Sequence, residues 1–198
     1  EASKLEGKTM VCLKPCDTYS FNQLIKEHRV DRDKAYIVGV GCKGKLDIEK
    51  AKKLDQIVGV IENPAAQEKI MLETLKVILA ENEIEINEKQ LERIDAFYEL
   101  LMEKNRVMDL TNITEPREVA LRHMADSLFL TKCADFSGKK VADIGTGAGF
   151  PGMPLLMADE NLDITMVDST GKRIDFINET MGKIGSCDKA IAITARAE

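Results

Sequence analysis

Apolar residues recur at helical spacing in the middle third of the chain. Residues 72–83, LETLKVILAENE, form one such segment, and a second opens at Asn87, where Gln90 completes a capping-box pattern. The apolar face of this second helix is expected at Leu91, Ile94, Tyr98 and Leu101. The stretch LTNITEPRE (110–118) then breaks the pattern, and residues 119–132 predict a third helix.

Short apolar runs alternate with helical segments in the last third. Strands are expected at 140–144, 163–168 (DITMVD) and 189–194, within KAIAITARAE. Between them we expect a helix over 151–158 and a second helix capped by Ser169 and ended by Gly185. The buried face of the second helix is expected at Ile174, Ile177, Met181 and Ile184. Strands that alternate with helices predict an α/β fold with a parallel sheet.

The first third repeats this alternation. KTMVCL (8–13) and AYIVGVGC (35–42) predict strands, and the helical spacing between them, in TYSFNQLIKEH (18–28), makes the unit βαβ. A third helix and a third apolar run (57–61) follow. We therefore expect a small α/β segment over 1–62, a linker over 63–70, a helical part over 71–136 and a Rossmann-like part over 137–198.

Composition narrows the class of protein. Hydrophobic residues make up 44% and charged residues 31% of the 198 positions. No apolar run approaches the roughly 20 residues of a membrane span, and the N-terminus lacks the apolar core of a secretory signal. We therefore expect a cytoplasmic protein without membrane contact. Net charge is +2 over the first 64 residues and −8 over the rest, so any RNA contact must come from a local basic patch.

The five cysteines are an odd number without the close pairing of a zinc ribbon. This count predicts reduced thiols, with Cys133 and Cys187 buried as small hydrophobic residues, and no metal site. Cys16 and Cys42 lie at the carboxyl ends of the two expected N-terminal strands, where α/β sheets usually place ligands. An iron–sulfur or redox site and two ordinary reduced cysteines both remain open for this pair.

Glycines crowd the turn after the strand at 140–144, in KVADIGTGAGFPG. Gly147, Gly149 and Gly152 match the dinucleotide fingerprint GxGxxG, with Asp168 about where a ribose-binding acid is expected. A tight turn without a ligand is a second interpretation. The third interpretation is a site for S-adenosylmethionine, in which the backbone amides of the turn close on the ligand.

Two acids favour this third interpretation. Asp143, Gly145, Gly147 and Gly149 form DxGxGxG, so a carboxylate stands at the strand end. Such a carboxylate attracts the ammonium group of a methionine moiety but repels a pyrophosphate. Asp168, after the next strand, is expected to accept hydrogen bonds from both ribose hydroxyls, because an ionised carboxylate only accepts.

Residues 71–198 resemble the bacterial small-subunit ribosomal RNA guanine-N(7) methyltransferase family called RsmG or GidB. The matching stretches are YELLMEKNRVMDLTNIT, RHMADSL, VADIGTGAGFPGMPL, VDSTGKRIDFI and RAE. The resemblance implies an incomplete Rossmann-like class I methyltransferase domain. It also implies that Gly145, Phe150, Asp168, Ala197 and Glu198 bind S-adenosylmethionine.

The resemblance extends to the substrate, which it implies is small-subunit ribosomal RNA or an assembling ribosomal subunit. Lys172 and Arg173 are candidates to face RNA phosphate, with solvated surface positions as the alternative. His123 is either a structural residue beside Asp126 or a wall of the substrate pocket. Transfer to a guanine ring nitrogen needs no general base, so no catalytic side chain is expected.

The chain departs from this family in two places. Asp109 stands where the family usually has asparagine, which removes two hydrogen-bond donors. The family also continues beyond the position of Glu198, so we expect weak donor binding and no turnover unless another chain or domain completes the fold. Residues 8–62 are a candidate to cover the open edge of the last strand, at 189–194.

An alternative function comes from a second resemblance. About 50 residues of the first segment are similar to part of the beta subunit of deazaflavin-dependent hydrogenases and dehydrogenases, which are iron–sulfur flavoproteins, but lack the closely spaced cluster cysteines. This alternative is a redox module with an iron–sulfur or flavin partner, in which the glycine turn binds a dinucleotide.

Overall fold

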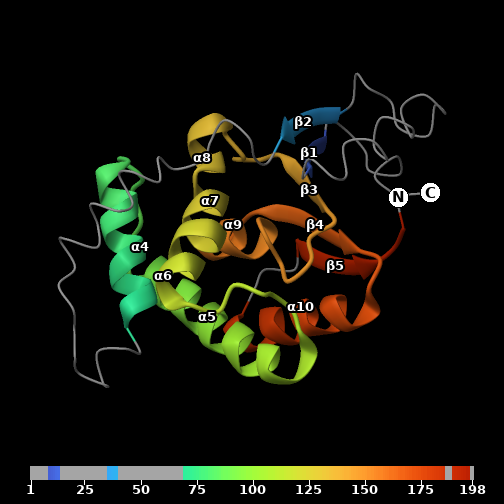
Figure 1. Cartoon of the computed structure of the whole chain (residues 1–198). Coiled ribbons are helices and arrows are strands. Elements are labelled where there is room, and N and C mark those ends of the chain that lie inside the picture. Colours follow the sequence, from blue (N-terminus) through green and yellow to red (C-terminus); the bar gives the residue numbers. More distant parts are fainter. Residues whose placement is uncertain (1–8, 14–34, 40–68, 186–188, 197–198) are drawn as a thin grey trace.

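The computed structural model describes residues 9–13, 35–39, 69–185 and 189–196 of the 198-residue chain (Figure 1). The strands are β1 (Thr9–Leu13), β2 (Ala35–Gly39), β3 (Lys140–Ile144), β4 (Asp163–Asp168) and β5 (Ala190–Thr194). The helices are α4 (Ile70–Glu81), α5 (Glu88–Met108), α6 (Pro116–Val119), the π-helical turn η3 (Ala120–Ala125), α7 (Asp126–Leu128), α8 (Leu130–Cys133), α9 (Gly152–Ala158) and α10 (Gly171–Ile184). The expected α/β class and the three strands of the last third are confirmed.

All described strands form one parallel sheet. Its order is β2-β1-β3-β4-β5, with β3 in the middle. Because every strand runs in the same direction, the carboxyl ends of all five lie at one edge of the sheet. The glycine turn follows β3 and therefore lies at this edge.

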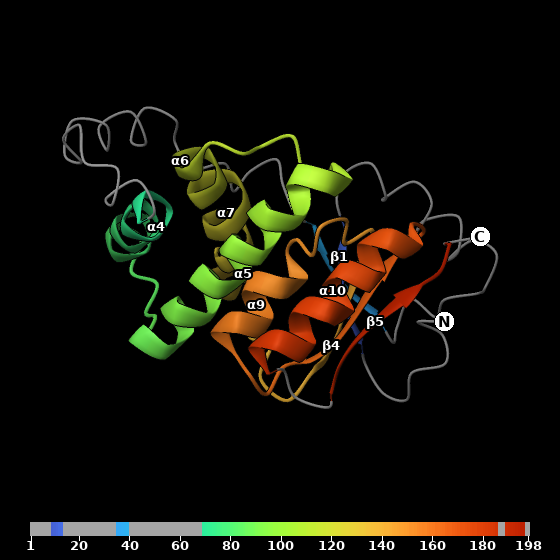
Figure 2. The same cartoon turned by 90° about the horizontal axis from the view of Figure 1, so that it is seen from below.

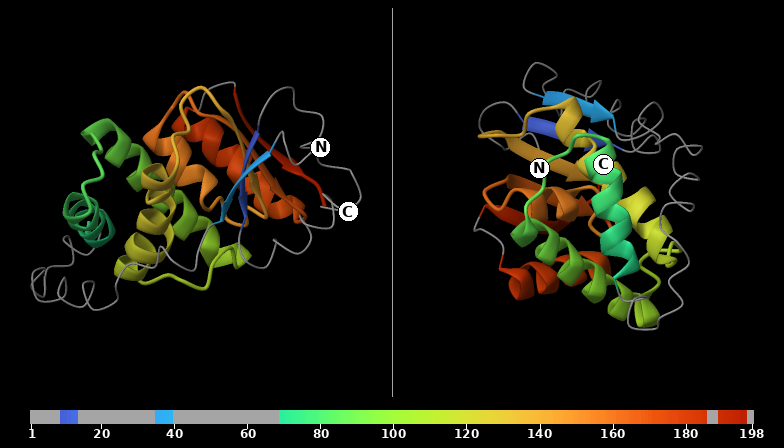
Figure 3. Two further views of the ribbon diagram at one scale, coloured as in Figure 1. Left: turned by 90° about the horizontal axis from the view of Figure 1, so that it is seen from above. Right: turned by 90° about the vertical axis from the view of Figure 1, so that its left-hand side faces the viewer.

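The N-terminal strands do not cover the edge that the sequence suggested. β1 pairs with β3, from Thr9 opposite Lys140 to Leu13 opposite Ile144, and not with β5 (Figure 3). The two described strands of this segment therefore do not cover the β5 edge, the rest of 8–62 lies outside the described residues, and the sheet has five described strands instead of three. The helix expected over 18–28 and the apolar run at 57–61 lie outside the described residues, and the division of the chain near 63–70 stays a prediction.

Helices α9 and α10 return the chain between successive strands, and α5 runs beside them on the same side of the sheet (Figure 2). The α5 helix begins with the expected capping box, in which the Asn87 side chain accepts from the Gln90 amide and the Gln90 side chain accepts from the Asn87 amide. Its buried face is centred on Phe97, whereas Tyr98, which we expected there, is only partly buried.

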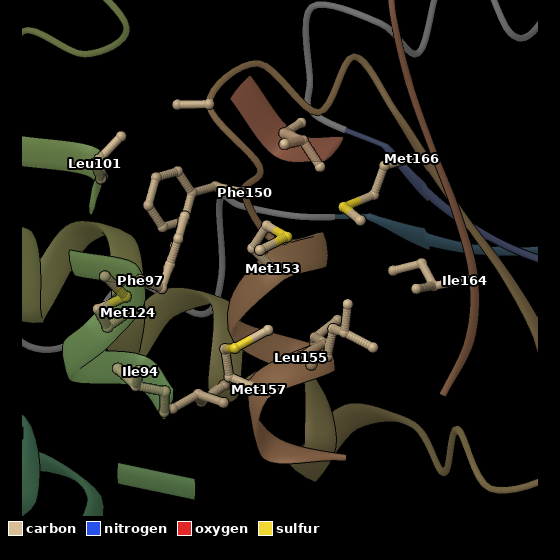
Figure 4. Close-up of a cluster of buried hydrophobic side chains, with 14 of the residues drawn as sticks. Ile94, Phe97, Leu101, Met124, Phe150, Met153, Leu155, Met157, Ile164 and Met166 are labelled. Atoms are coloured by element: carbon tan, nitrogen blue, oxygen red, sulfur yellow. The ribbon is translucent and has the colours of Figure 1, made fainter. Parts of the chain in front are cut away.

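One hydrophobic core joins the helical part to the sheet (Figure 4). The Phe97 ring is fully buried, with its centroid 5.5 Å from that of Phe150 in the glycine turn and 6.5 Å from that of Phe176 on α10. Methionines from three elements, Met124, Met153 and Met166, belong to the same core (Figure 4). The helical part therefore packs directly against the glycine turn.

The third expected helix is interrupted. Its first segment, α6, begins at Pro116, a first helical position where proline's missing N–H costs nothing. The π-helical turn η3 and the short helices α7 and α8 follow it. Among the described residues, no helix is long and apolar enough to cross a membrane.

Two smaller expectations are wrong. Ser169 does not cap α10, because Thr170 occupies that position and makes no side-chain capping bond. Cys133 is exposed, since it ends the short helix α8 at the surface. Cys187 lies outside the described residues.

Candidate functional site

The glycine turn joins β3 to α9 through left-handed backbone conformations. Gly145, Gly147 and Gly149 have φ values of 76°, 62° and 98°, which residues with a side chain rarely adopt. A Cβ added to Gly149 would approach Met153 Cγ to 2.5 Å, and one added to Gly152 would approach Asp143 Oδ2 to 2.9 Å. Packing inside the protein therefore requires these last two glycines, whether or not a ligand binds.

Most amides of the turn donate to the protein itself. Gly145 and Thr146 N–H donate to Val167 O, and Gly149 and Phe150 N–H donate to Thr146 O, at 2.8–3.0 Å. Amides committed in this way do not form a cradle for a pyrophosphate. These amides already have partners within the protein, and the expectation that the turn grips its ligand through backbone amides stays a prediction.

Asp143 fixes the two ends of the turn. The residue is 1% exposed, and its carboxylate Oδ2 accepts from Thr146 Oγ1 at 2.6 Å and from Gly152 N–H at 3.0 Å. The sequence suggested that this acid meets the ammonium group of a ligand. In the structure its carboxylate holds the turn against the start of α9, and the contact with an ammonium group stays a prediction.

Asp168 ties the ends of three elements together. Oδ2 accepts from Gly147 N–H at 2.9 Å and Oδ1 accepts from Thr170 N–H at 2.8 Å, while the carbonyl of Asp168 accepts from Ala195 N–H after β5. The residue is 6% exposed. Each carboxylate oxygen has two lone pairs, so acceptor capacity remains on a carboxylate held against the glycine turn.

The two basic candidates differ in their surroundings. Arg173 Nη1 lies 3.5 Å from Asp168 Oδ2, with the Arg173 side chain 40% exposed, so this guanidinium is partly neutralised by the candidate site itself. Lys172 is exposed at the start of α10. Ala197 and Glu198 lie outside the described residues.

A second cluster packs against Phe150, which is 8% exposed. The His123 ring, on η3, stacks on the Phe150 ring with centroids 4.3 Å apart and planes 13° apart. His123 Nε2 is 2.8 Å from Thr111 Oγ1, and Asn105 exchanges two hydrogen bonds with the Thr111 backbone. The structure thus brings His123 to the glycine turn.

Sequence reasoning missed Asn105 and Thr111. Both lie in the stretch YELLMEKNRVMDLTNIT that carries the resemblance. Their polar side chains, close to a predicted helix end, were the available signal. The hydrogen bonds between Asn105 and Thr111 span six residues, and they form only when the loop after α5 folds back against the end of that helix.

Metal-binding groups and cavities are the other kinds of site that the described chain could offer. No group of three or more possible metal-ligating side chains occurs in the described ranges. A cavity of about 210 Å³ lies between the start of α5 and the end of α9, lined by residues such as Lys89, Arg93 and Glu160. None of the candidate residues that the structure describes lines this cavity.

Comparison with known proteins gives one consistent result. The family model for GidB, rRNA small subunit methyltransferase G, matches residues 90–198. The chain is 40% identical over 130 residues to a protein named ribosomal RNA small subunit methyltransferase G from Pelotomaculum thermopropionicum, which covers 65% of this chain and 54% of the relative. It is 42% identical over 126 residues to the protein of that name from Desulforamulus reducens, and this match covers 63% of this chain and 52% of the relative. The chain thus spans about half the length of these relatives.

Proposed function

The chain belongs to the rRNA small subunit methyltransferase G family, and we propose that it binds S-adenosylmethionine at the turn between β3 and α9. The family that the sequence suggested is thereby confirmed, as is the Rossmann-like class I methyltransferase fold. The family's methyl transfer implies this donor. Which residues of this chain hold the donor remains a proposal.

The observation that carries the proposal is the position of the Asp168 carboxylate. It is held against a glycine turn in which most backbone amides already donate hydrogen bonds within the protein. An acceptor-only group at the end of the second strand suits the two hydroxyls of a ribose. A dinucleotide would in addition need free amides for its pyrophosphate. The hydrogen bonds of the turn therefore argue against the dinucleotide alternative, and Cys16 and Cys42, on which a redox module would depend, lie outside the described residues.

The residues present fit the donor in chemical terms. Asp168 would accept from the ribose, and Phe150 would offer an apolar wall beside Gly145 and Gly147. Asp143 would act indirectly by fixing the turn. We extend the proposal to Ala197 and Glu198 near the adenine on the strength of the family resemblance.

We further propose that the acceptor is a guanine N7 of small-subunit ribosomal RNA, free or in an assembling subunit, and that the reaction takes place in the cytoplasm. Bound S-adenosylmethionine would supply an activated methyl group for in-line transfer to the lone pair of N7. No base is needed, so the protein contributes alignment. Lys172, Arg173 and His123 are the proposed substrate-side residues.

Calorimetric titration with S-adenosylhomocysteine tests the donor site. We expect wild-type chain to bind it and D168N to bind at least tenfold more weakly, since hydrogen bonds to a charged group contribute about 1.5–3 kcal/mol. The matched control is D163N, which changes the other end of the same strand and should leave the affinity unchanged. Tighter binding of NAD than of S-adenosylhomocysteine, or no effect of D168N, would overturn the proposal.

A further inference from the structure

The strand order reverses between β1 and β3. From β3 the chain moves to β4 and then β5 in one direction across the sheet, whereas β1 and β2 extend in the other direction. In open parallel sheets, ligands bind outside the carboxyl ends of the strands at such a switch point. The glycine turn follows β3 at this point of the sheet.

The strand that creates this switch point comes from outside the family match. The family model covers residues 90–198, whereas β1 is Thr9–Leu13. The first segment of this chain, whose role the sequence left open, therefore supplies the neighbour of the central strand.

The register brings β1 close to the turn. Cys12 lies opposite Asp143 and Leu13 opposite Ile144, the last residue before the turn. Neighbouring strands lie about 4.8 Å apart. The backbone of β1 therefore ends beside the position from which Asp143 holds Thr146 and Gly152.

We propose that β1 forms the second side of the donor site, so that donor binding depends on the pairing of β1 with β3. This inference rests on the proposed function and names the part of the chain that completes the site. Without β1, the hydrogen-bonding groups along one edge of β3 would face water, and the strand end that fixes the turn would fray. With β1, β3 is held from both sides and the turn keeps one geometry.

Cross-linking in the full-length chain tests the pairing by itself. In T9C/K140C the two Cα atoms are register partners, at a spacing that a disulfide spans, so we expect a bond under mild oxidation, identified by peptide mapping. In the matched control T9C/D163C the second cysteine is one strand farther away, and no bond is expected. Absence of the bond in T9C/K140C overturns the inference.

Titration with S-adenosylhomocysteine tests whether donor binding depends on the pairing of β1 with β3. V11P places proline in the middle of β1, between β2 and β3, and should weaken binding at least tenfold. The control I37P places proline in β2, which does not pair with β3, and should have a smaller effect. If V11P loses its cooperative thermal transition, L13G, at the end of β1 beside the turn, is used in its place.

The outcomes separate the two proposals. Binding by the wild type, with V11P (or L13G) weakened more than I37P and the oxidised T9C/K140C still binding, supports the inference. Wild-type binding with V11P or L13G unaffected overturns the inference alone. No binding by the wild type overturns the proposed function, and the inference with it.

Discussion

Asp109 ends α5 in the left-handed conformation, with φ 46° and ψ 53°. Asparagine adopts this conformation readily, and an acid at a helix C-terminus interacts unfavourably with the helix dipole. In this chain Asp109 thus serves as the left-handed end of α5, a role that does not depend on side-chain donors.

We predict that D109N stabilises the protein by about 0.5–1 kcal/mol, seen as a higher midpoint in thermal unfolding. E92Q removes one acidic charge from the exposed face of the same helix, away from its end, and should give no such gain. An unchanged or lower midpoint for D109N would show that the dipole and cap argument fails.

His123 is expected to position Phe150, since its ring stacks on Phe150 and its Nε2 is held by Thr111. H123A should weaken S-adenosylhomocysteine binding about three- to tenfold, because an aromatic pair contributes about 0.5–1.5 kcal/mol. Isothermal titration measures this.

Two further variants test whether His123 acts through its ring. H123F keeps a flat ring against Phe150 and should therefore bind S-adenosylhomocysteine almost as tightly as the wild type. T111V removes the hydrogen bond to His123 and should produce an intermediate loss. If H123A lowers the melting midpoint but leaves the affinity unchanged, His123 does not position the site.

At the scale of elements, α5 and α10 are joined by charge as well as by packing. Glu179 on α10 accepts from Lys183 Nζ at 2.8 Å on its own helix and from Lys104 Nζ at 2.9 Å on α5. These two ammonium groups, Lys183 first, lower the pKa of Glu179 from 4.5 to about 2.

The pH dependence of this contact has a definite sign. A carboxyl whose pKa is lower in the folded state stabilises the fold above its ordinary pKa and loses that effect as pH falls toward the folded value. E179Q should therefore unfold at a slightly lower temperature than wild type above pH 5, with the difference closing between about pH 4.5 and 2. Because the pair is exposed, 0.5 M salt should shrink the difference. A difference that grows as the pH falls would contradict the assignment.

The interrupted helix shows what periodicity cannot resolve. Residues 119–132 have helical spacing throughout, and the sequence predicts one continuous helix. The wider π-helical turn at Ala120–Ala125 shifts the following residues by a fraction of a turn. Such a shift depends on how α4 and the glycine turn pack against the segment, and no residue type marks it.

At the scale of the whole molecule, Phe97 joins the helical part to the sheet. Its ring is 0% exposed and contacts both Phe150 and Phe176. We predict that F97A lowers the free energy of unfolding by about 3–5 kcal/mol and that denaturant unfolding stays a single transition.

F129A is the matched control, because Phe129 is only partly buried at the edge of the same core, and its cost should be smaller. Two separate transitions in F97A, or equal losses in the two variants, would mean that the helical part and the sheet do not share one core.

The candidate site was predictable where residues close in sequence define it. The glycine turn and Asp168 follow from the pattern of strand, glycines and acid, and the structure places them together. The sequence predicts that Asp143 contacts the ammonium group of a ligand, which stays a prediction, but it did not reveal that the buried carboxylate accepts hydrogen bonds from Thr146 and Gly152. It missed Thr111, because only tertiary contact brings this residue to His123.

The sequence by itself determined the local elements of this protein: the capping box of α5, the strands β3 to β5, the left-handed Gly185 at the end of α10 and the family. These features depend on hydrophobic period, capping residues and glycine conformation, which act over a few neighbouring residues. Only the tertiary structure decided that β1 lies against β3 and that the amides of the glycine turn are used inside the protein. Strand neighbours and hydrogen-bond partners are chosen by competition among distant segments, and the spacing of residues along the chain does not record that competition.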